Sequence, residues 1–319
     1  MVQENILKFI SETENNEVFI QLNKRINIKY KKCQKFDGTV ENIIYQIGDG
    51  SIIKLFDKTP FPRKTTDVVC PHFVELKWAN GCPFNCSWCY LQGTFRFLNR
   101  KKNPFVKDVE KAKIHVWKFL NEVNHKKYVL NSGELADSLL SENHEKPFSK
   151  WIIPMFETQK NHKVLFLTKS TNIKNILEIE KHNQTIVSYS LNSEKVAKKW
   201  EKAPSPKERI KALKRLYEAG YEIRVRIDPM VPNENWQKEY KILIDMLFSN
   251  LEPERITLGS LRGLQSTINE SEDKSWVKYL SECSNWGKKI DFNKRFEMYS
   301  TLIEYLEEIW SRKYKMYIQ

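Results

Sequence analysis

Three cysteines in one short segment are the residues most suited to chemistry. Cys82, Cys86 and Cys89 stand within eight residues, so a single loop can direct three thiolates at one inorganic centre. A structural zinc site uses four protein ligands in paired spacings, and no fourth Cys or His follows nearby, the nearest histidines being His72 and His115. Three thiolates suit an iron–sulfur cluster that leaves one iron open to a substrate or cofactor. A cysteine loop with a purely structural role is the alternative.

The overall composition predicts a soluble protein and leaves an anionic partner open. Cys33, Cys70 and Cys283 stand apart, so the six cysteines of this 319-residue chain do not indicate a disulfide framework. The 53 Lys and Arg residues exceed the 40 Asp and Glu residues, which gives a formal net charge of +13. No apolar run approaches the roughly 18 residues that span a bilayer, and the N-terminus lacks the basic and apolar regions of a signal peptide. We therefore expect a cytoplasmic protein without a membrane partner.

Short β-prone runs alternate with helical stretches from about residue 73 onward. The predicted strands cover residues 73–78, 127–130, 164–168, 185–191, 222–227 and 255–258. The predicted helices cover residues 106–122, 145–158, 171–181, 206–219, 236–248 and 297–316. Ser205 and Glu208 have the spacing of a capping box at the start of the helix over 206–219. Strands separated by helices favour right-handed βαβ units, so the pattern predicts an α/β fold with a parallel sheet or partial barrel.

Polar residues stand at the ends of several predicted strands. In parallel α/β architectures the loops that follow the strands build the site, so we expect these side chains to converge on one ligand. The alternative is that they cap the helices that follow. The positions are Asn131-Ser132-Gly133-Glu134, Lys169-Ser170, Asn192-Ser193 and Asp228, and Arg262 follows the last predicted strand.

The cysteine segment and several downstream motifs resemble a known enzyme family. The Cys-x-x-x-Cys-x-x-Cys spacing, with Trp88 before the third Cys, resembles the signature of the radical S-adenosylmethionine (SAM) superfamily. The continuation Cys89-Tyr90-Leu91-Gln92 is similar to the narrower spore photoproduct lyase family, a group of DNA-repair enzymes and their relatives. Further motifs resemble that family in order and spacing, over roughly residues 70 to 260: Leu167-Thr168-Lys169, Ser188 to Asn192, Ser205 to Tyr221 and Ile227 to Met230.

The resemblance implies a partial (β/α)6 barrel of the TIM type over residues 66–262. A small mixed N-terminal segment, residues 1–65, and a mostly helical C-terminal extension, residues 263–319, complete the predicted organisation. Prolines and basic residues gather at 57–66 and indicate a connector near the first boundary.

The same resemblance implies a cofactor and a reaction class. Cys82, Cys86 and Cys89 would hold a [4Fe–4S] cluster, with SAM on its fourth iron and an electron donor such as flavodoxin or ferredoxin. The reduced cluster would cleave SAM, and the resulting 5′-deoxyadenosyl radical would abstract a hydrogen atom from a substrate.

Residues at three strand ends are expected to bind SAM. Glu134 resembles the end of the Gly-Gly-Glu type motif that accepts a hydrogen bond from the SAM ammonium, and Gly133 allows a close backbone approach. Lys169 stands where the lyases carry a lysine that meets the SAM carboxylate; its alternative role is a solvated lysine at a helix start. For Ser190 and Asn192 the alternative role is helix capping. The full expected set is Ser132, Gly133, Glu134, Lys169, Ser190 and Asn192.

One departure from the family concerns the return of a hydrogen atom to the product. Tyr90 matches a tyrosine thought to relay hydrogen in the lyases, whereas the other relay tyrosine corresponds to Trp88. The lyase cysteine that donates the hydrogen falls at or near Glu134, and no Cys occurs between Cys89 and Cys283. We therefore expect hydrogen abstraction from an unidentified substrate that differs from the thymine dimer or is only distantly related to it. Two alternatives stay open: a DNA photoproduct lyase with a rewired hydrogen donor, and a non-catalytic iron–sulfur protein that binds nucleic acid.

Basic and aromatic residues interleave directly after the cysteine segment. Phe95 and Phe97 alternate with Arg96, and the run Arg100-Lys101-Lys102 follows. This pattern suits phosphate contacts combined with base stacking, so nucleic acid is a candidate partner. The alternative is an ordinary solvated loop in a lysine-rich protein.

Overall fold

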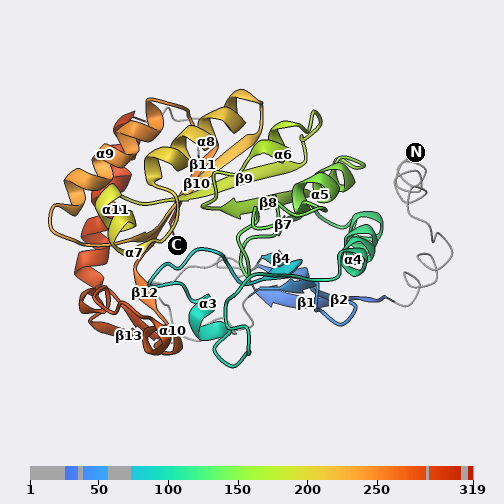
Figure 1. Cartoon of the computed structure of the whole chain (residues 1–319), viewed down its shortest axis with the longest axis horizontal. Coiled ribbons are helices and arrows are strands. Elements are labelled where there is room, and N and C mark those ends of the chain that lie inside the picture. The colour runs from blue at the N-terminus through green and yellow to red at the C-terminus, as the bar shows by residue number, and fades with distance from the viewer. Residues whose placement is uncertain (1–25, 35–38, 57–72, 285–286, 310–314, 319) are drawn as a thin grey trace. The chain divides into compact units, whose positions relative to one another are not determined.

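The computed structural model describes residues 26–34, 39–56, 73–284, 287–309 and 315–318. These residues form two compact units, whose elements are labelled in Figure 1. Of the described residues, the first unit contains those up to Asn80, Phe105–Phe166 and Lys174–Ile186, and the second contains Gly81–Pro104, Leu167–Ile173 and those from Val187 onward. The predicted connector at 57–66 lies outside the described residues, and so does Cys70.

The first unit is built on a sheet that begins antiparallel and continues parallel. Its strand order is β1 (Ile28–Gln34), β2 (Val40–Ile47), β3 (Ile53–Leu55), β4 (Val74–Leu76), β7 (Val129–Asn131) and β8 (Lys163–Thr168), the last two residues of β8 belonging to the second unit. Neighbours pair antiparallel from β1 to β4 and parallel from β4 to β8. The other elements are the short paired strands β5 (Ala79–Asn80) and β6 (Phe105–Val106) and the helices α4 (Val109–Glu122), α5 (Phe148–Phe156) and α6 (Lys174–Leu177).

Stacked aromatic rings fill the core of the first unit. Trp78 lies parallel to Phe148, with 3.9 Å between ring centroids, and Phe148 packs against Phe166 of β8. The indole N–H of Trp78 donates to the carbonyl of Ser132 at 3.0 Å. The end of β7 is therefore fixed to the core by a buried hydrogen bond.

The second unit contains a parallel sheet with helices packed on it. Its strand order is β9 (Thr185–Leu191), whose first two residues belong to the first unit, β10 (Glu222–Met230), β11 (Arg255–Ser260) and β15 (Lys315–Ile318). The main helices are α7 (Glu194–Trp200), α8 (Pro206–Glu218), α9 (Trp236–Phe248) and α11 (Phe292–Ile309). A small sheet of β12 (Arg262–Gly263), β14 (Gly287–Lys289) and β13 (Glu282–Ser284) and the short helices α3 (Leu91–Thr94) and α10 (Gln265–Glu270) complete the unit.

Alternation along β10 shows why this sheet has one apolar and one polar face. Ile223, Val225 and Ile227 are buried, whereas Arg224 and Arg226 between them are partly exposed. Helix α8 contacts β10, and α11 lies against α9. Apolar side chains of the strand thus face the core, and the polar side chains lie on the opposite face, where Arg224 pairs with Glu222 and Arg226 with Asp228.

The predicted α/β class with a parallel sheet is confirmed, because all six predicted strands are present as β4, β7, β8, β9, β10 and β11. The helix predicted over 171–181 is reduced to α6, since the Thr168 and Ser170 hydroxyls accept hydrogen bonds from the backbone N–H two residues later and hold a turn. None of the described helices is both long and apolar enough to cross a membrane.

One predicted helix has different bounds in the structure, and one helix was not predicted. The closing helix predicted over 297–316 begins at Phe292 and ends at Ile309, and residues 315–318 form strand β15 against β11. The run Met316-Tyr317-Ile318 has β-prone residues, which explains the strand. Helix α7 was not predicted, although Ser193 accepts from the N–H of Val196 as an ordinary N-cap. For Ser193 the capping alternative is therefore correct.

Candidate functional site

The cysteine loop starts at a glycine that the surrounding backbone requires. Gly81 has a φ of +85°, and a Cβ at this position would lie 2.4 Å from the carbonyl oxygen of Lys102 and 2.5 Å from that of Asn103. The N–H of Cys82 donates to the same Lys102 carbonyl at 3.0 Å. A larger residue would push the chain away, so the first cysteine owes its place to Gly81.

Backbone hydrogen bonds define the turn that carries the other two cysteines. The N–H of Cys89 donates to the carbonyl of Cys86 at 3.1 Å, and the Gln92 side chain donates to the same carbonyl at 2.7 Å. The Lys102 ammonium donates to the carbonyl of Phe84 at 2.6 Å. Tyr90 follows as the N-cap residue of α3, and its carbonyl accepts from the N–H of Thr94.

The Cys86 and Cys89 thiols are buried, and several cations act on them: Lys169 on both, Arg209 on Cys86 and Lys102 on Cys89. Burial raises the pKa of Cys86 to about 12 and also raises that of Cys89, while the charge of Lys169 opposes both shifts. Such thiols stay protonated until a metal ion binds and replaces the proton on the sulfur, because coordination deprotonates a thiol outright. The free Cys86 side chain is only 7% exposed. These cysteines are therefore suited to metal binding rather than to nucleophilic attack.

The donor set of the loop fits an iron–sulfur cluster. Between Cys82 and Gln92 the segment contains no His, Asp or Glu that would compete as a ligand. Across the described residues, no three His, Cys, Asp or Glu side chains stand in an arrangement that would hold a single metal ion. A cubane places each thiolate on a different iron, so its ligands stand farther apart than those of one ion. Thiolate-only ligation is typical of such clusters.

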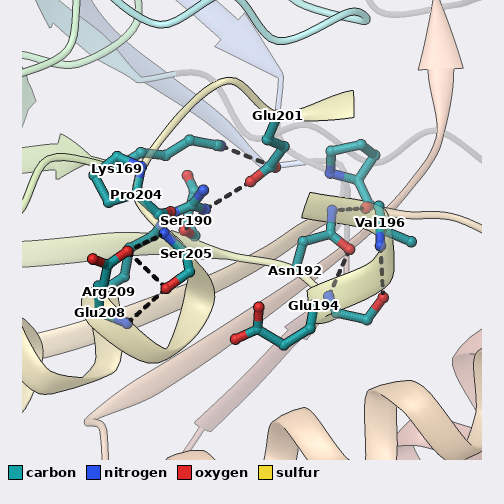
Figure 2. A network of polar contacts seen from close by, with 12 residues as sticks. Lys169, Ser190, Asn192, Glu194, Val196, Glu201, Pro204, Ser205, Glu208 and Arg209 are labelled. Atoms are coloured by element: carbon teal, nitrogen blue, oxygen red, sulfur yellow. Dashed lines mark hydrogen bonds and ion pairs between the residues drawn. The ribbon is translucent and has the colours of Figure 1, made fainter. Parts of the chain in front are cut away.

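Lys169 belongs to a buried ionic network, which Figure 2 shows. The carboxylate of Glu201, 1% exposed, lies 2.7 Å from the guanidinium of Arg209, which is 0% exposed. The Lys169 ammonium lies 3.6 Å from the other carboxylate oxygen. Arg209 also donates to the carbonyls of Pro204 at 2.7 Å and Ser190 at 3.0 Å. One carboxylate thus serves two cations.

Counted together, Lys169, Arg209 and Glu201 carry two positive charges and one negative charge. Burial alone would raise the pKa of Glu201, but Lys169 and Arg209 outweigh it, so the pKa lies below its usual value and the carboxylate is ionised. The Lys169 side chain keeps 17% of its surface exposed. A ligand with a carboxylate could meet this ammonium without leaving Glu201 unpaired, because Arg209 remains in contact with it.

Asn192 is buried in a second network at the end of β9. Its side-chain N–H donates to the carbonyl of Pro229 at 2.9 Å, and its side-chain oxygen accepts from the Tyr240 hydroxyl at 2.8 Å. The same hydroxyl accepts from the N–H of Val231 at 2.7 Å, and burial raises the pKa of Tyr240. Asn192 therefore ties β9 to the end of β10, and its contact with SAM stays a prediction.

The predicted residues Ser132, Gly133 and Glu134 lie in the first unit, at the end of β7. The Ser132 hydroxyl lies 2.9 Å from the Leu165 carbonyl, to which it donates. The Asn131 side chain donates to the Glu134 carboxylate at 2.8 Å and accepts from the N–H of Gly133 at 3.0 Å. The turn is thus held by its own side chains. Of the ten predicted site residues, the second unit contains Tyr90, Lys169, Ser190, Asn192 and the three cysteines.

Glu201 and Arg209 were not among the expected site residues. Arg209 lies within the stretch Ser205 to Tyr221 that resembles the family, and Glu201 is followed directly by Lys202 in the sequence. The useful signal was the capping box, which the structure confirms: the hydroxyl of Ser205 accepts from the N–H of Glu208, and the Glu208 carboxylate accepts from the N–H of Ser205. It fixes the first turn of α8 and so the position of Arg209.

Replacing Arg209 with Met should lower the free energy of unfolding by about 3–5 kcal/mol, because the Glu201 carboxylate keeps its burial and loses its closest cation. Urea denaturation followed by circular dichroism measures the loss. Adding Glu201→Gln should cost less than the sum of the two single changes, since no unpaired charge is then left. Strictly additive losses would contradict the coupling. As a control, Lys214→Met, in an exposed pair with Glu218, should change stability by about 0.5 kcal/mol or less.

The comparisons with known proteins agree on one family. The family model described as "Spore photoproduct lyase" matches residues 70–260, more than half of the chain. The spore photoproduct lyases of Clostridium acetobutylicum and Bacillus subtilis are each 24% identical, over 174 and 176 residues. These matches cover 53% and 54% of this chain and 50% of each relative, so the chain spans about half the length of the curated relatives it matches.

A solved structure shows the same fold. It is a spore photoproduct lyase double mutant with bound AdoMet and dinucleoside spore photoproduct, with a TM-score of 0.65 and 19% identity. The match covers 77% of this chain and 75% of that one. The resemblance first seen in the cysteine segment is confirmed, and the chain belongs to the spore photoproduct lyase family.

Proposed function

We propose that this chain is a radical SAM enzyme. The observation that carries the proposal is the cysteine loop itself, whose three thiols have no competing ligand within the loop. The charge of Lys169 acts on two of these thiols, those of Cys86 and Cys89. Cys82, Cys86 and Cys89 would hold a [4Fe–4S] cluster. When bound, the reduced cluster would supply one electron to the sulfonium of SAM, and cleavage of the carbon–sulfur bond would give methionine and a 5′-deoxyadenosyl radical able to abstract hydrogen from a substrate.

The protein's task in this reaction is to orient SAM and exclude water. Lys169 would bind the SAM carboxylate, since its ammonium carries the excess charge of the ionic network. Glu134 would accept from the SAM ammonium, with Gly133 allowing close approach, and Ser132, Ser190 and Asn192 would complete the contacts. A flavodoxin or ferredoxin would supply the electron.

The return of hydrogen distinguishes the candidate substrates. Tyr90 stands at the start of α3, directly after Cys89, where a phenol could donate to a product radical. Cys283 is exposed on β13. Because the lyase cysteine has no counterpart between Cys89 and Cys283, we propose a substrate other than the thymine dimer.

A DNA photoproduct is the second candidate substrate, and the loop after the cysteines favours it. Phe97 is 82% exposed, and the Arg96 guanidinium lies 4.1 Å from the centre of its ring. An exposed ring beside cations is suited to stacking on a base next to phosphates. The spore photoproduct bound to the solved lyase mutant supports this candidate, in which Tyr90 or another residue would replace the cysteine donor.

Anaerobic reconstitution with iron and sulfide should give a brown protein that, with dithionite, cleaves SAM to 5′-deoxyadenosine and methionine. Cys86→Ala should lose the cluster absorbance and the cleavage, because a ligand is removed. Absorbance spectra, iron content and chromatography of the products measure both. Wild-type protein that carries a full cluster and yields neither product would exclude the enzyme and favour the non-catalytic alternative. Cys283→Ala is the control and should keep its cluster.

Lys169→Gln should weaken SAM binding about 10- to 100-fold while the cluster absorbance stays intact, since a hydrogen bond to a charged group is worth about 1.5–3 kcal/mol. Equilibrium dialysis with labelled SAM measures the affinity of cluster-loaded protein. Lys202→Gln, whose side chain is 69% exposed, should leave the affinity unchanged. Equal affinity of the Lys169 variant and the wild type would refute the assignment.

A nucleic-acid substrate predicts binding of UV-irradiated DNA that weakens steeply with salt. Phe97→Ala should reduce the affinity about 5- to 100-fold, because one stacked base is worth about 1–3 kcal/mol. Fluorescence anisotropy with a labelled oligonucleotide at several salt concentrations measures both effects. Phe296→Ala removes another exposed phenylalanine of the second unit, 63% exposed, and serves as the control. Absence of binding at low salt would remove nucleic acid as a partner.

A further inference from the structure

A segment beyond the family match lies against the cysteine loop. This segment, residues 264–279, follows β12 and contains α10, which contacts α3 immediately after the loop. The contact is close at Gly93, where a Cβ would lie 2.5 Å from the Ser266 hydroxyl and 2.7 Å from the Thr267 N–H nitrogen. Only glycine permits this approach.

Both backbone groups of Ser87, between the second and third cysteines, are held from outside the loop. Its N–H donates to the carbonyl of Trp200 at 2.8 Å. Its carbonyl lies 2.8 Å from the buried hydroxyl of Ser271, which donates to it across 184 positions of sequence. The turn between Cys86 and Cys89 is therefore clamped from two sides, by the end of α7 and by the segment 264–279.

The Ser271 hydroxyl is itself fixed by a buried tryptophan. The indole N–H of Trp276 donates to it at 3.3 Å, and the Asp273 carbonyl, also 2.8 Å away, shares the single proton of the hydroxyl with the Ser87 carbonyl. Trp276 is fully buried and packs so closely on Gly263 that a Cβ there would lie 2.6 Å from the ring. The orientation of the hydroxyl thus depends on a rigid core residue.

A second link joins the same segment to the helix end that holds Ser87. The indole N–H of Trp200 donates to the hydroxyl of Ser275 at 2.8 Å, and the Trp200 ring lies 5.8 Å from that of Trp88 in the cysteine loop. Trp200, which accepts from the Ser87 N–H, and the segment that donates to the Ser87 carbonyl are therefore joined by a hydrogen bond of their own.

We infer that Ser271 and Trp276 are positioning residues, which hold the Cys86–Cys89 turn in the conformation that receives the cluster. This role rests on the proposed function for its purpose, but its effect on the thiols is a property of the metal-free protein. A buried turn opens rarely, and each opening exposes the thiols. Loss of the Ser271 hydrogen bond makes opening more frequent.

Alkylation of the metal-free protein with iodoacetamide, followed by peptide mass spectrometry, tests the inference. Ser271→Ala should speed the modification of Cys86 and Cys89 about 3- to 10-fold, the change expected from one lost hydrogen bond. The rate at Cys33, which is buried in the first unit, should not change. Ser249→Ala removes a hydroxyl from the exposed end of α9 and should leave all three rates at the wild-type values.

Unchanged rates at Cys86 and Cys89 in Ser271→Ala would overturn the inference. An equal rise at Cys33 would overturn it too, since it would indicate general loosening rather than opening of the turn. Should Ser271→Ala fail to fold, Trp276→Phe, which removes the N–H that fixes Ser271, is measured with the same expectations. Reconstituted Ser271→Ala should also lose its cluster absorbance to a chelator faster than the wild type. A wild type that binds no cluster would refute the proposed function and leave the thiol result standing.

Discussion

The buried carboxylate of Glu201 constrains the part of the second unit that surrounds it. Glu201 can stay ionised there only because Arg209 and Lys169 meet it, and an unpaired charge at this depth would be strongly destabilising. The requirement fixes three points of the chain together: the end of α7, the first turn of α8 and the residue after β8. Since Arg209 also bonds to the Ser190 carbonyl, the end of β9 joins them. Lys169 is consequently held near the thiols by a framework rather than by its own flexible stem.

The cysteine loop follows a different principle, because its bonds are made almost entirely by main-chain groups. Carbonyls of Phe84, Cys86 and Ser87 accept from side chains. The Cys89 sulfur accepts from the backbone N–H groups of Leu91 and Gln92. This arrangement suits a site that must receive an inorganic group, because backbone N–H groups can also donate to the sulfurs of a bound cluster.

Local patterns in the sequence were sufficient to predict much of the fold, and the proposed cluster ligands also depend on a local pattern. The spacing of Cys82, Cys86 and Cys89 is itself local, and so is the capping box at Ser205, which the structure confirms. Prediction failed where the decisive partner is far away in sequence. Glu201 looks like an ordinary surface acid until Lys169 and Arg209 surround it.

The role of Ser271, strand β15 and helix α7 were also not predicted, because the partner lies far away in the sequence or because the element is short. Nothing near Ser271 reveals a partner 184 residues earlier. Strand β15 is a strand because β11 offers it an edge, which a pattern of four residues cannot show. Helix α7 is only seven residues long, too short for a clear helical period, although its N-cap serine was present in the sequence.

Because Gly81 and Gly93 are shaped to surfaces elsewhere in the chain, the cysteine loop between them would not keep its conformation outside this protein. Gly81 is needed because of the carbonyls of residues 102 and 103, and Gly93 because of Ser266 and Thr267. An excised peptide over residues 81–93 would retain every thiol and lose the surfaces that shape it. The same spacing of cysteines transplanted into another scaffold would therefore bring the ligands without their geometry.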